Sequence, residues 1–344
     1  MNLRTSPLVL RLGVVAFGLV LGFCAPVPEA AGIGRSKTKQ TPAPTVARPA
    51  RAAIGAIPAP IYGLTLDNTD DLPAIIAALG KFSKKMTVRI VFDEGMDPAD
   101  YREAVDRIHE VAYILGQPAD SSYVKHYALG QYRARFSEYL AAFAGQVDLW
   151  EVGNEVNGNW LGPPAEVAAK MSAAYDTVGA AGQKTVLTLV FNEGQDCAVS
   201  PQCAEAPQYE MYSWVERYVP ERMKRGLDYV LFSYYPENSP QFKPDWGSEF
   251  AKIGRIFPSS RLGFGELGTD GTEAQKAALI NEFYPMRIGH PRYIKGCFWW
   301  YARQDMVPHT KPLWRVLDRA ISTAHLPPPT LGERRAWLGK CALK

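Results

Sequence analysis

The feature that most constrains this chain is a regular alternation of short apolar segments with longer amphipathic ones from about residue 60 to 322. Short apolar runs are typical of buried strands, and the longer runs are typical of helices that cover them. The strand candidates are Ile61–Asp67, Thr87–Phe92, Ala112–Leu115, Val147–Val152, Thr185–Phe191, Tyr229–Tyr234, Arg261–Glu266 and Tyr293–Trp300. The helix candidates are Asp71–Phe82, Pro98–Val111, Tyr132–Ala144, Ala165–Ala181, Gln208–Arg225, Trp246–Ile256, Glu273–Tyr284 and Leu313–Ala320.

The number of repeats distinguishes two architectures. An open, doubly wound sheet also alternates strands with helices, but it gives no reason for the alternation to stop at eight. A (β/α)8 TIM barrel needs eight of each. The sequence therefore predicts an α/β fold, a single barrel over residues 59–324. Asp97 before Pro98 and Thr272 before Glu273 are residue types that cap helix N-termini, so we expect helices to begin there.

The N-terminus has the pattern of a secretory signal peptide. Arg4 and Arg11 precede the apolar run Leu12–Ala25, which at 14 residues is shorter than a membrane-spanning helix of roughly 20 residues. We therefore expect a secreted or periplasmic protein with no stable membrane insertion after signal removal. Cys24 leaves lipid attachment open, although Phe23 stands where lipoprotein signals need a small residue. An uncleaved membrane anchor is a further alternative.

We assign residues 1–31 to this signal, 32–58 to a flexible linker rich in Pro, Ala and basic residues, and 325–344 to a C-terminal tail. Residues 1–55 carry seven Lys or Arg and one acid, which leaves 31 basic and 34 acidic residues in the rest of the chain. Since nucleic-acid binding needs a concentrated basic face, we expect no nucleic-acid partner. Nothing in the sequence specifies an oligomer, and we expect a monomer.

The cysteines and histidines indicate no metal site. Cys197 and Cys203 enclose a short loop, and in an exported protein such a pair predicts a disulfide. Cys297 lies in an apolar run and is expected in the core, whereas the state of Cys341 stays open. The five histidines show neither H-x-H nor H-E-x-x-H spacing, and no G-x-S-x-G motif indicates an α/β-hydrolase.

Two strand candidates end in acidic motifs. The fourth reads Leu149-Trp-Glu-Val-Gly-Asn154-Glu155, and the seventh reads Arg261-Leu-Gly-Phe-Gly-Glu266-Leu-Gly. The C-terminal ends of all strands in such a barrel meet at one rim, where active sites lie. A retaining glycosidase needs two carboxyl groups about 5–5.5 Å apart, one to attack the anomeric carbon and one to protonate the leaving sugar. Glu155 and Glu266 could supply this pair.

These motifs, within the eight-strand alternation, resemble clan A of the (β/α)8 retaining glycoside hydrolases, without indicating one family in the clan. The resemblance implies that Glu155 is the acid/base, that Glu266 is the nucleophile and that Asn154 donates to the sugar 2-hydroxyl. It also implies hydrolysis of O-glycosidic bonds in a β-linked polysaccharide or oligosaccharide by double displacement, with no metal or organic cofactor.

Single residues extend the resemblance. Arg89 resembles the second-strand arginine that holds the nucleophile ionised. Tyr234 resembles the sixth-strand aromatic whose hydroxyl contacts the nucleophile, although the His-x-Tyr of several clan members is absent. Trp299 and Trp300 resemble the eighth-strand tryptophan under the sugar, and strand alternation lets only one of them face the site. Asp67 also ends a strand and is a candidate substrate contact.

Each of these assignments has an alternative. Arg89 could form a structural ion pair, and the aromatic candidates could fill core volume. Residues 263–268 match the dinucleotide motif G-x-G-x-x-G, but Glu266 in its middle would repel a phosphate and too few strands follow it. Two further functions stay open, a non-catalytic saccharide-binding barrel and a transglycosidase acting on the same glycans.

Overall fold

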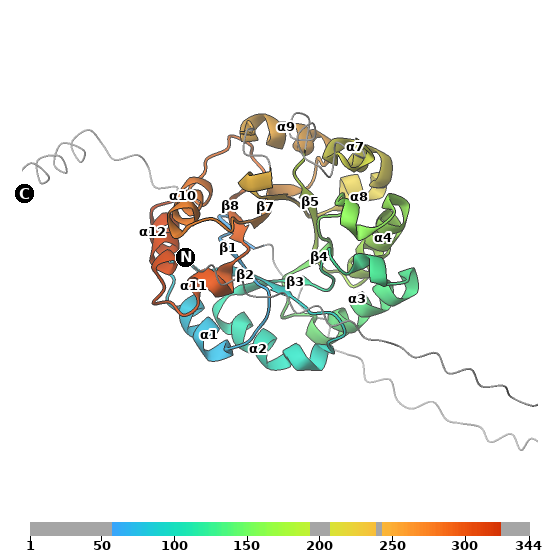
Figure 1. The fold of residues 1–344 in the computed structure, drawn as a ribbon. Coiled ribbons are helices and arrows are strands. Elements are labelled where there is room, and N and C mark those ends of the chain that lie inside the picture. Colours follow the sequence, from blue (N-terminus) through green and yellow to red (C-terminus); the bar gives the residue numbers. More distant parts are fainter. Residues whose placement is uncertain (1–56, 193–206, 239–242, 325–344) are drawn as a thin grey trace, which may run out of the picture. The chain divides into compact units, whose positions relative to one another are not determined.

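The computed structural model describes residues 57–192, 207–238 and 243–324 of the chain (Figure 1). The expected signal peptide, most of the expected linker and the C-terminal tail lie outside these residues, as do Cys197 and Cys203. Across the described residues, every helix falls short of the length and apolar character that a bilayer span requires.

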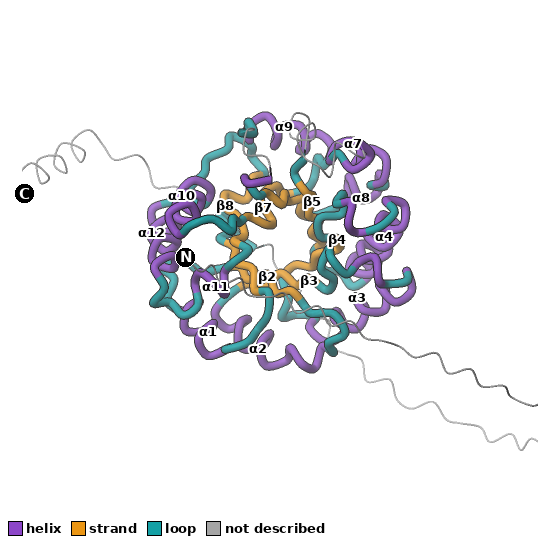
Figure 2. The backbone as a smooth tube through the Cα atoms, viewed as in Figure 1, coloured by secondary structure: helices purple, strands orange, loops and turns teal. Residues whose placement is uncertain are grey.

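Eight parallel strands form the centre of the structure. They are β1 (Gly63–Leu66), β2 (Thr87–Val91), β3 (Tyr113–Gln117), β4 (Leu149–Gly153), β5 (Thr185–Val190), β6 (Tyr229–Tyr234), β7 (Arg261–Leu267) and β8 (Tyr293–Trp299). Each strand pairs with the next, and β8 pairs with β1, so the sheet closes into a barrel. Figure 2 shows the strands as an inner ring with helices around it. The predicted (β/α)8 fold is therefore confirmed.

The helices cover the outside of the barrel. They are α1 (Leu72–Gly80), α2 (Arg102–Val111), α3 (Leu129–Phe143), α4 (Pro164–Ala180), α7 (Met211–Tyr218), α8 (Glu221–Gly226), α9 (Trp246–Ile256), α10 (Glu273–Phe283), α11 (Ala302–Met306) and α12 (Pro312–Thr323). Short 3-10 turns are η1 (Pro98–Tyr101), η2 (Val124–His126), η3 (Asn159–Leu161), η4 (Pro207–Tyr209) and η5 (Pro236–Asn238). Both predicted caps are confirmed, since Asp97 accepts from the backbone N–H of Ala99 and Thr272 from that of Gln275.

Some helix boundaries differ from the prediction. The single helix predicted over Gln208–Arg225 is two helices, α7 and α8, because Pro220 lacks an N–H and its ring clashes with a preceding helical turn. The helix predicted from Pro98 begins as η1 and continues as α2. The short helix α11, between β8 and α12, has no counterpart among the sequence-based candidates.

The barrel interior changes from apolar to polar along its axis. Alternate strand residues such as Val88 and Ile90 belong to the large apolar cluster between the strands and the helices. A smaller apolar cluster fills the interior toward the N-terminal ends of the strands; it comprises Ile57, Ile61, Leu115, Leu149, Val186, Tyr229, Leu231, Ile294 and Phe298. Toward the C-terminal ends, the buried inward side chains are polar; they include Arg89, Glu151, Thr188, Ser233 and Glu266. The polar side chains therefore lie at the C-terminal end of the barrel interior, next to the apolar layer.

We predict that Gly296→Ala lowers the free energy of unfolding by about 2–3 kcal/mol through overpacking. A Cβ on Gly296, in β8, would lie 2.0 Å from the carbonyl oxygen of Ile61, a backbone atom of the neighbouring chain segment. Gly80→Ala, at the end of α1, is the matched control, because a Cβ there meets nothing within 4 Å. It should be neutral or slightly stabilising. Equal losses in urea unfolding of the two variants would contradict the prediction.

Candidate active site

Glu155 lies just beyond the end of β4 in a strained backbone conformation. Its φ is 50°, in the left-handed region that favours glycine. The register between β4 and β5 also shifts between Glu151 and Gly153, immediately before it. Strain and register shifts of this kind occur preferentially beside functional sites, where they re-aim side chains. The strain is therefore located at a residue that the sequence predicts to be catalytic.

Two serines hold the carboxyl group of Glu155. Ser233, on β6, donates to Oε1 at 2.7 Å, and Ser121, between β3 and α3, donates to Oε2 at 2.9 Å. Ser233 is also the residue of β6 that pairs with Glu266 of β7. The carboxyl group of Glu155 therefore lies against the strand next to the one that bears Glu266.

The surroundings raise the pKa of Glu155 to about 8. The largest cause is desolvation, which penalises the charged form, and the second is the negative charge of Glu266. The hydrogen bonds from Ser233 and Ser121 lower the pKa and so oppose these effects in part. Glu155 is consequently protonated at neutral pH, and its carboxyl group lies close enough to that of Glu266 for their charges to interact.

Glu266 is buried near the C-terminal end of β7 and is held by three donors. Arg89 Nη1 lies 2.6 Å from Oε2, and the hydroxyl of Tyr235 donates to Oε1 at 2.7 Å. Asn154 Nδ2 lies 3.5 Å from Oε2, and its own Oδ1 accepts from the backbone N–H of Ser121 at 3.0 Å. These contacts fix the orientation of the Glu266 carboxylate and bring together three of the residues predicted from the sequence.

Arg89 is fully buried and is shared by two carboxylates. Its Nε lies 2.8 Å from Glu151 Oε2, and Thr188 donates to the other oxygen of Glu151. Burial raises the pKa of Glu151, and the positive charge of Arg89 opposes that effect. Glu151 is absent from the sequence-based candidates, although an acid inside a buried strand signals a buried cationic partner.

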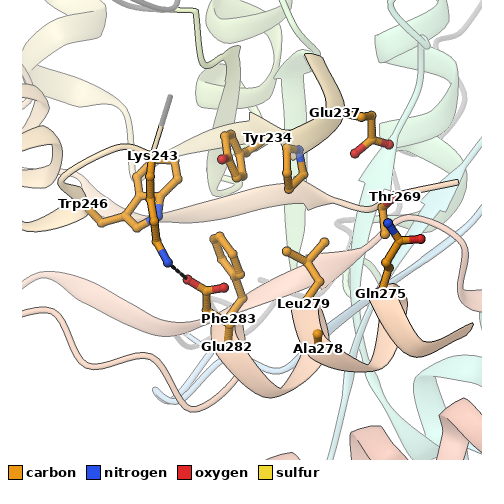
Figure 3. Close-up of a pocket in the computed structure, with 11 residues that line it drawn as sticks. Tyr234, Glu237, Lys243, Trp246, Thr269, Gln275, Ala278, Leu279, Glu282 and Phe283 are labelled. Carbon is orange, nitrogen blue, oxygen red and sulfur yellow. Dashed lines mark ion pairs between the residues drawn. The ribbon is translucent and has the colours of Figure 1, made fainter. Parts of the chain in front are cut away.

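The contact expected of Tyr234 is made by its neighbour, Tyr235. Side chains alternate along β6, and because Ser233 faces the interior, Tyr234 faces the helices. Its ring packs against Trp246 in a pocket of about 500 Å³ lined by residues of β6, α9, α10 and the connections between them (Figure 3). Neither Glu155 nor Glu266 lines this pocket. The assignment of the nucleophile contact to Tyr234 is therefore wrong by one residue.

Trp299 and Trp300 have different surroundings. Trp299 is fully buried in the apolar core between the strands and the helices, and its Nε1 donates to Asp305 at 2.9 Å. Trp300 is partly exposed, and the guanidinium of Arg89 lies 5.7 Å from its ring centre. Of the two tryptophans, only Trp300 is therefore partly exposed beside the site, and Trp299 fills core volume.

Asp67 lies just after β1 and is tied to α11. It forms an ion pair with Arg303 at 2.8 Å and accepts a hydrogen bond from the amide of Gln304. Both of its carboxylate oxygens thus have partners within the chain. The structure accounts for Asp67 as an anchor of α11, and no contact joins it to either candidate catalytic glutamate.

The hydrogen-bonding groups of the site suit a ligand rich in hydroxyl groups. Carboxylates, serines, an amide and a tyrosine can each exchange hydrogen bonds with hydroxyls, and Trp300 offers an aromatic surface. Within residues 57–192, 207–238 and 243–324, no three His, Cys, Asp or Glu side chains converge as they would around a metal ion. Cys297 is a free buried thiol, in line with the core position expected for it.

Comparisons with known proteins show the fold. No protein-family model and no curated protein matches this chain. A GH5_18 from Bifidobacterium longum subsp. infantis matches with a TM-score of 0.50 at 11% identity, covering 78% of this chain and 81% of that one. A glycoside hydrolase family 5 enzyme from Prevotella bryantii B14 matches with a TM-score of 0.48 at 14% identity, covering 77% and 96%. Orotidine 5'-monophosphate decarboxylase from Methanocaldococcus jannaschii matches with a TM-score of 0.42 at 13% identity, covering 78% and 100%. At this level of identity, the match to the GH5_18 protein shows the TIM-barrel fold alone.

We predict that Glu155→Gln is more stable than the wild-type protein at about pH 8 and that the gain vanishes below about pH 4.5. In the unfolded chain Glu155 loses its proton near pH 4.5, whereas the folded protein keeps it up to about pH 8. Between these values the stability of the wild type falls as the pH rises, because unfolding then releases a proton. Glutamine preserves the shape of the side chain but does not titrate.

Urea unfolding of both proteins at about pH 4.5, 6 and 8 measures this difference. Glu138→Gln, at an exposed position on α3, is the control and should show no pH-dependent gain. A gain of the same size at all three pH values for Glu155→Gln would contradict a raised pKa.

Proposed function

We propose that this chain is a retaining glycoside hydrolase that cleaves O-glycosidic bonds of a β-linked polysaccharide or oligosaccharide. The observation that carries the proposal is a pair of neighbouring glutamates in unlike surroundings. The pKa of Glu155 is raised to about 8, whereas Glu266 forms an ion pair with the buried Arg89 at 2.6 Å. A protonated carboxyl beside an ionised one is what double displacement at an anomeric carbon needs.

In the proposed reaction, an oxygen of Glu266 attacks the anomeric carbon while the bond to the leaving oxygen breaks and Glu155 gives that oxygen its proton. The sugar is then held as an ester of Glu266. Glu155, now ionised, takes a proton from water, and the water oxygen displaces Glu266 from the anomeric carbon. Two inversions give net retention, and the reaction needs neither a metal nor an organic cofactor.

The neighbouring side chains and the N-terminus support the same proposal. Asn154 lies 3.5 Å from Glu266 and is the residue that the resemblance to clan A assigns to the sugar 2-hydroxyl. The partly exposed Trp300 is the candidate surface under the attacked sugar. The signal-like composition of residues 1–31 supports export, so that the enzyme would meet its glycan outside the cytoplasm.

The direct test is incubation of the purified protein with β-linked glucans, mannans, xylans and galactans and their oligosaccharides. Mass spectrometry should show shorter glycans, and proton NMR should show the β-anomer as the first product. An α-anomer would exclude double displacement, and longer products would indicate a transglycosidase. Binding without cleavage would indicate a non-catalytic saccharide-binding barrel, and no interaction with any glycan would refute the proposal.

We predict different kinetic losses for the two glutamates. Glu266→Gln should lower kcat by at least about 10,000-fold on every substrate, because the nucleophile is lost. Glu155→Gln should lower kcat about 100- to 10,000-fold on substrates with a sugar leaving group. It should have far less effect on 2,4-dinitrophenyl glycosides, whose leaving group needs no proton. Steady-state kinetics on both substrate types would disprove the assigned roles if the two patterns were exchanged.

We predict that Tyr235→Phe lowers kcat about 10- to 100-fold, because a hydrogen bond to a charged group is lost at Glu266. Tyr234→Phe is the matched control, since the same hydroxyl is removed from the adjacent residue on the opposite side of β6. It should change kcat by less than about threefold. A larger loss of kcat in Tyr234→Phe than in Tyr235→Phe, measured on the same substrate, would assign the functional contact with Glu266 to Tyr234.

A further inference from the structure

Trp160 is connected to Glu155 through a single side chain. It lies in η3, which follows β4, and its Nε1 donates to Ser121 Oγ at 3.1 Å. Ser121 in turn donates to Glu155 Oε2 at 2.9 Å. The indole therefore lies at the same rim of the barrel as Glu155, two hydrogen bonds from its carboxyl group. Since Trp160 is only partly buried, part of its surface is accessible there.

The η3 segment is shaped around this indole. A Cβ on Gly158 would lie 2.6 Å from Cζ2 of Trp160, so any other residue at this position would displace the ring. Gly162, at the end of η3, has a φ of 110°, which side chains rarely permit. Gly158 thus leaves room for the indole, and Gly162 permits the turn of the backbone at the end of η3.

In the proposed reaction, the position of Trp160 corresponds to the leaving-group side of the cleaved bond. The oxygen that Glu155 protonates belongs to the leaving group, which must therefore lie beside Glu155. The sugar that is attacked lies beside Glu266, near Trp300 and Arg89. Trp160 contacts the Glu155 carboxyl through Ser121, and so it borders the leaving group.

We propose that Trp160 is the stacking surface for the sugar on the leaving-group side of the cleaved bond. This inference rests on the proposed function and narrows its substrate class, because the bond then joins two sugars and not a sugar to a small alcohol. A sugar ring presents a face of C–H groups that packs on an aromatic ring, while its hydroxyls stay directed at water and polar side chains.

An exposed aromatic residue lies beside the turn next to η3. The turn η2 contacts η3, and Tyr123, directly before η2, is 45% exposed. In the part of the chain that the structure describes, the large hydrophobic side chains that are exposed all follow β2 or β3; they are Met96, Tyr123 and Leu129. Tyr123, beside the turn that contacts η3, is therefore a candidate contact for a second sugar unit of the leaving group.

The experiment compares Trp160→Ala and Trp160→Phe on two leaving groups. One substrate is the oligosaccharide that the wild-type protein cleaves in the panel above, and the other is the glycosyl fluoride of the same sugar, since fluoride is too small to stack. Trp160→Ala should lower kcat/KM for the oligosaccharide about 10- to 100-fold and that for the fluoride by less than about threefold. Trp160→Phe keeps an aromatic face and should retain most of the oligosaccharide activity.

Two other variants test whether the loss in Trp160→Ala comes only from a general change of the structure. Gly158→Ala displaces the ring without removing it and should show the same selective loss for the oligosaccharide. Trp314→Ala is the control, because Trp314 is also partly buried and its Nε1 donates to Ala78 at 3.1 Å, but it lies on α12 outside the barrel. It should affect both substrates equally.

The outcomes separate this inference from the function on which it rests. If the wild-type protein cleaves no glycan and no glycosyl fluoride, the proposed function fails and this inference fails with it. If the wild type is active but Trp160→Ala affects both substrates equally, only the stacking role is overturned. A loss in Trp160→Phe as large as that in Trp160→Ala also overturns it, because Trp160 then acts through its hydrogen bond to Ser121.

Discussion

The structure depends on one buried cation. Arg89 lies inside the barrel, where its guanidinium joins Glu151 of β4 to Glu266 of β7. Removing a guanidinium from water is unfavourable, and only opposite charges and hydrogen bonds at close range offset that effect. Strands far apart in the sequence supply these partners only when the sheet closes. Closure of the barrel therefore brings both carboxylates to the one guanidinium.

The same cation makes the two candidate catalytic glutamates unlike. Glu266 lies against Arg89, whereas Glu155 is held by the neutral hydroxyls of Ser121 and Ser233. Because these hydroxyls compensate less for desolvation than a charge would, the pKa of Glu155 is raised to about 8. Two identical side chains thus acquire different surroundings, one in an ion pair with a buried cation and the other with a raised pKa.

The barrel is predictable from the sequence because each strand and helix leaves a local pattern, whereas only part of the site does. Glu155, Glu266 and Arg89 stand out within their own strands, and the structure brings them together. The choice between Tyr234 and Tyr235 depends on which face of β6 is inward, and a shift of one residue reverses it. The pairings around β7 contain register irregularities that no local pattern indicates. Glu151 could have been found as an acid inside a buried strand, whereas the partners drawn from other segments leave no such signal; they are Ser121, Trp160, Thr188 and Ser233.

In the proposed reaction, the charge of Glu266 also controls when Glu155 releases and accepts a proton. That charge is the second cause of the raised pKa of Glu155. When Glu266 forms an ester with the sugar, its charge disappears, and the pKa of Glu155 must fall. The ionised Glu155 is then ready to take a proton from water in the second step. Release of the sugar restores the charge of Glu266 and with it the raised pKa, so one electrostatic coupling keeps the protonation of Glu155 in step with the reaction.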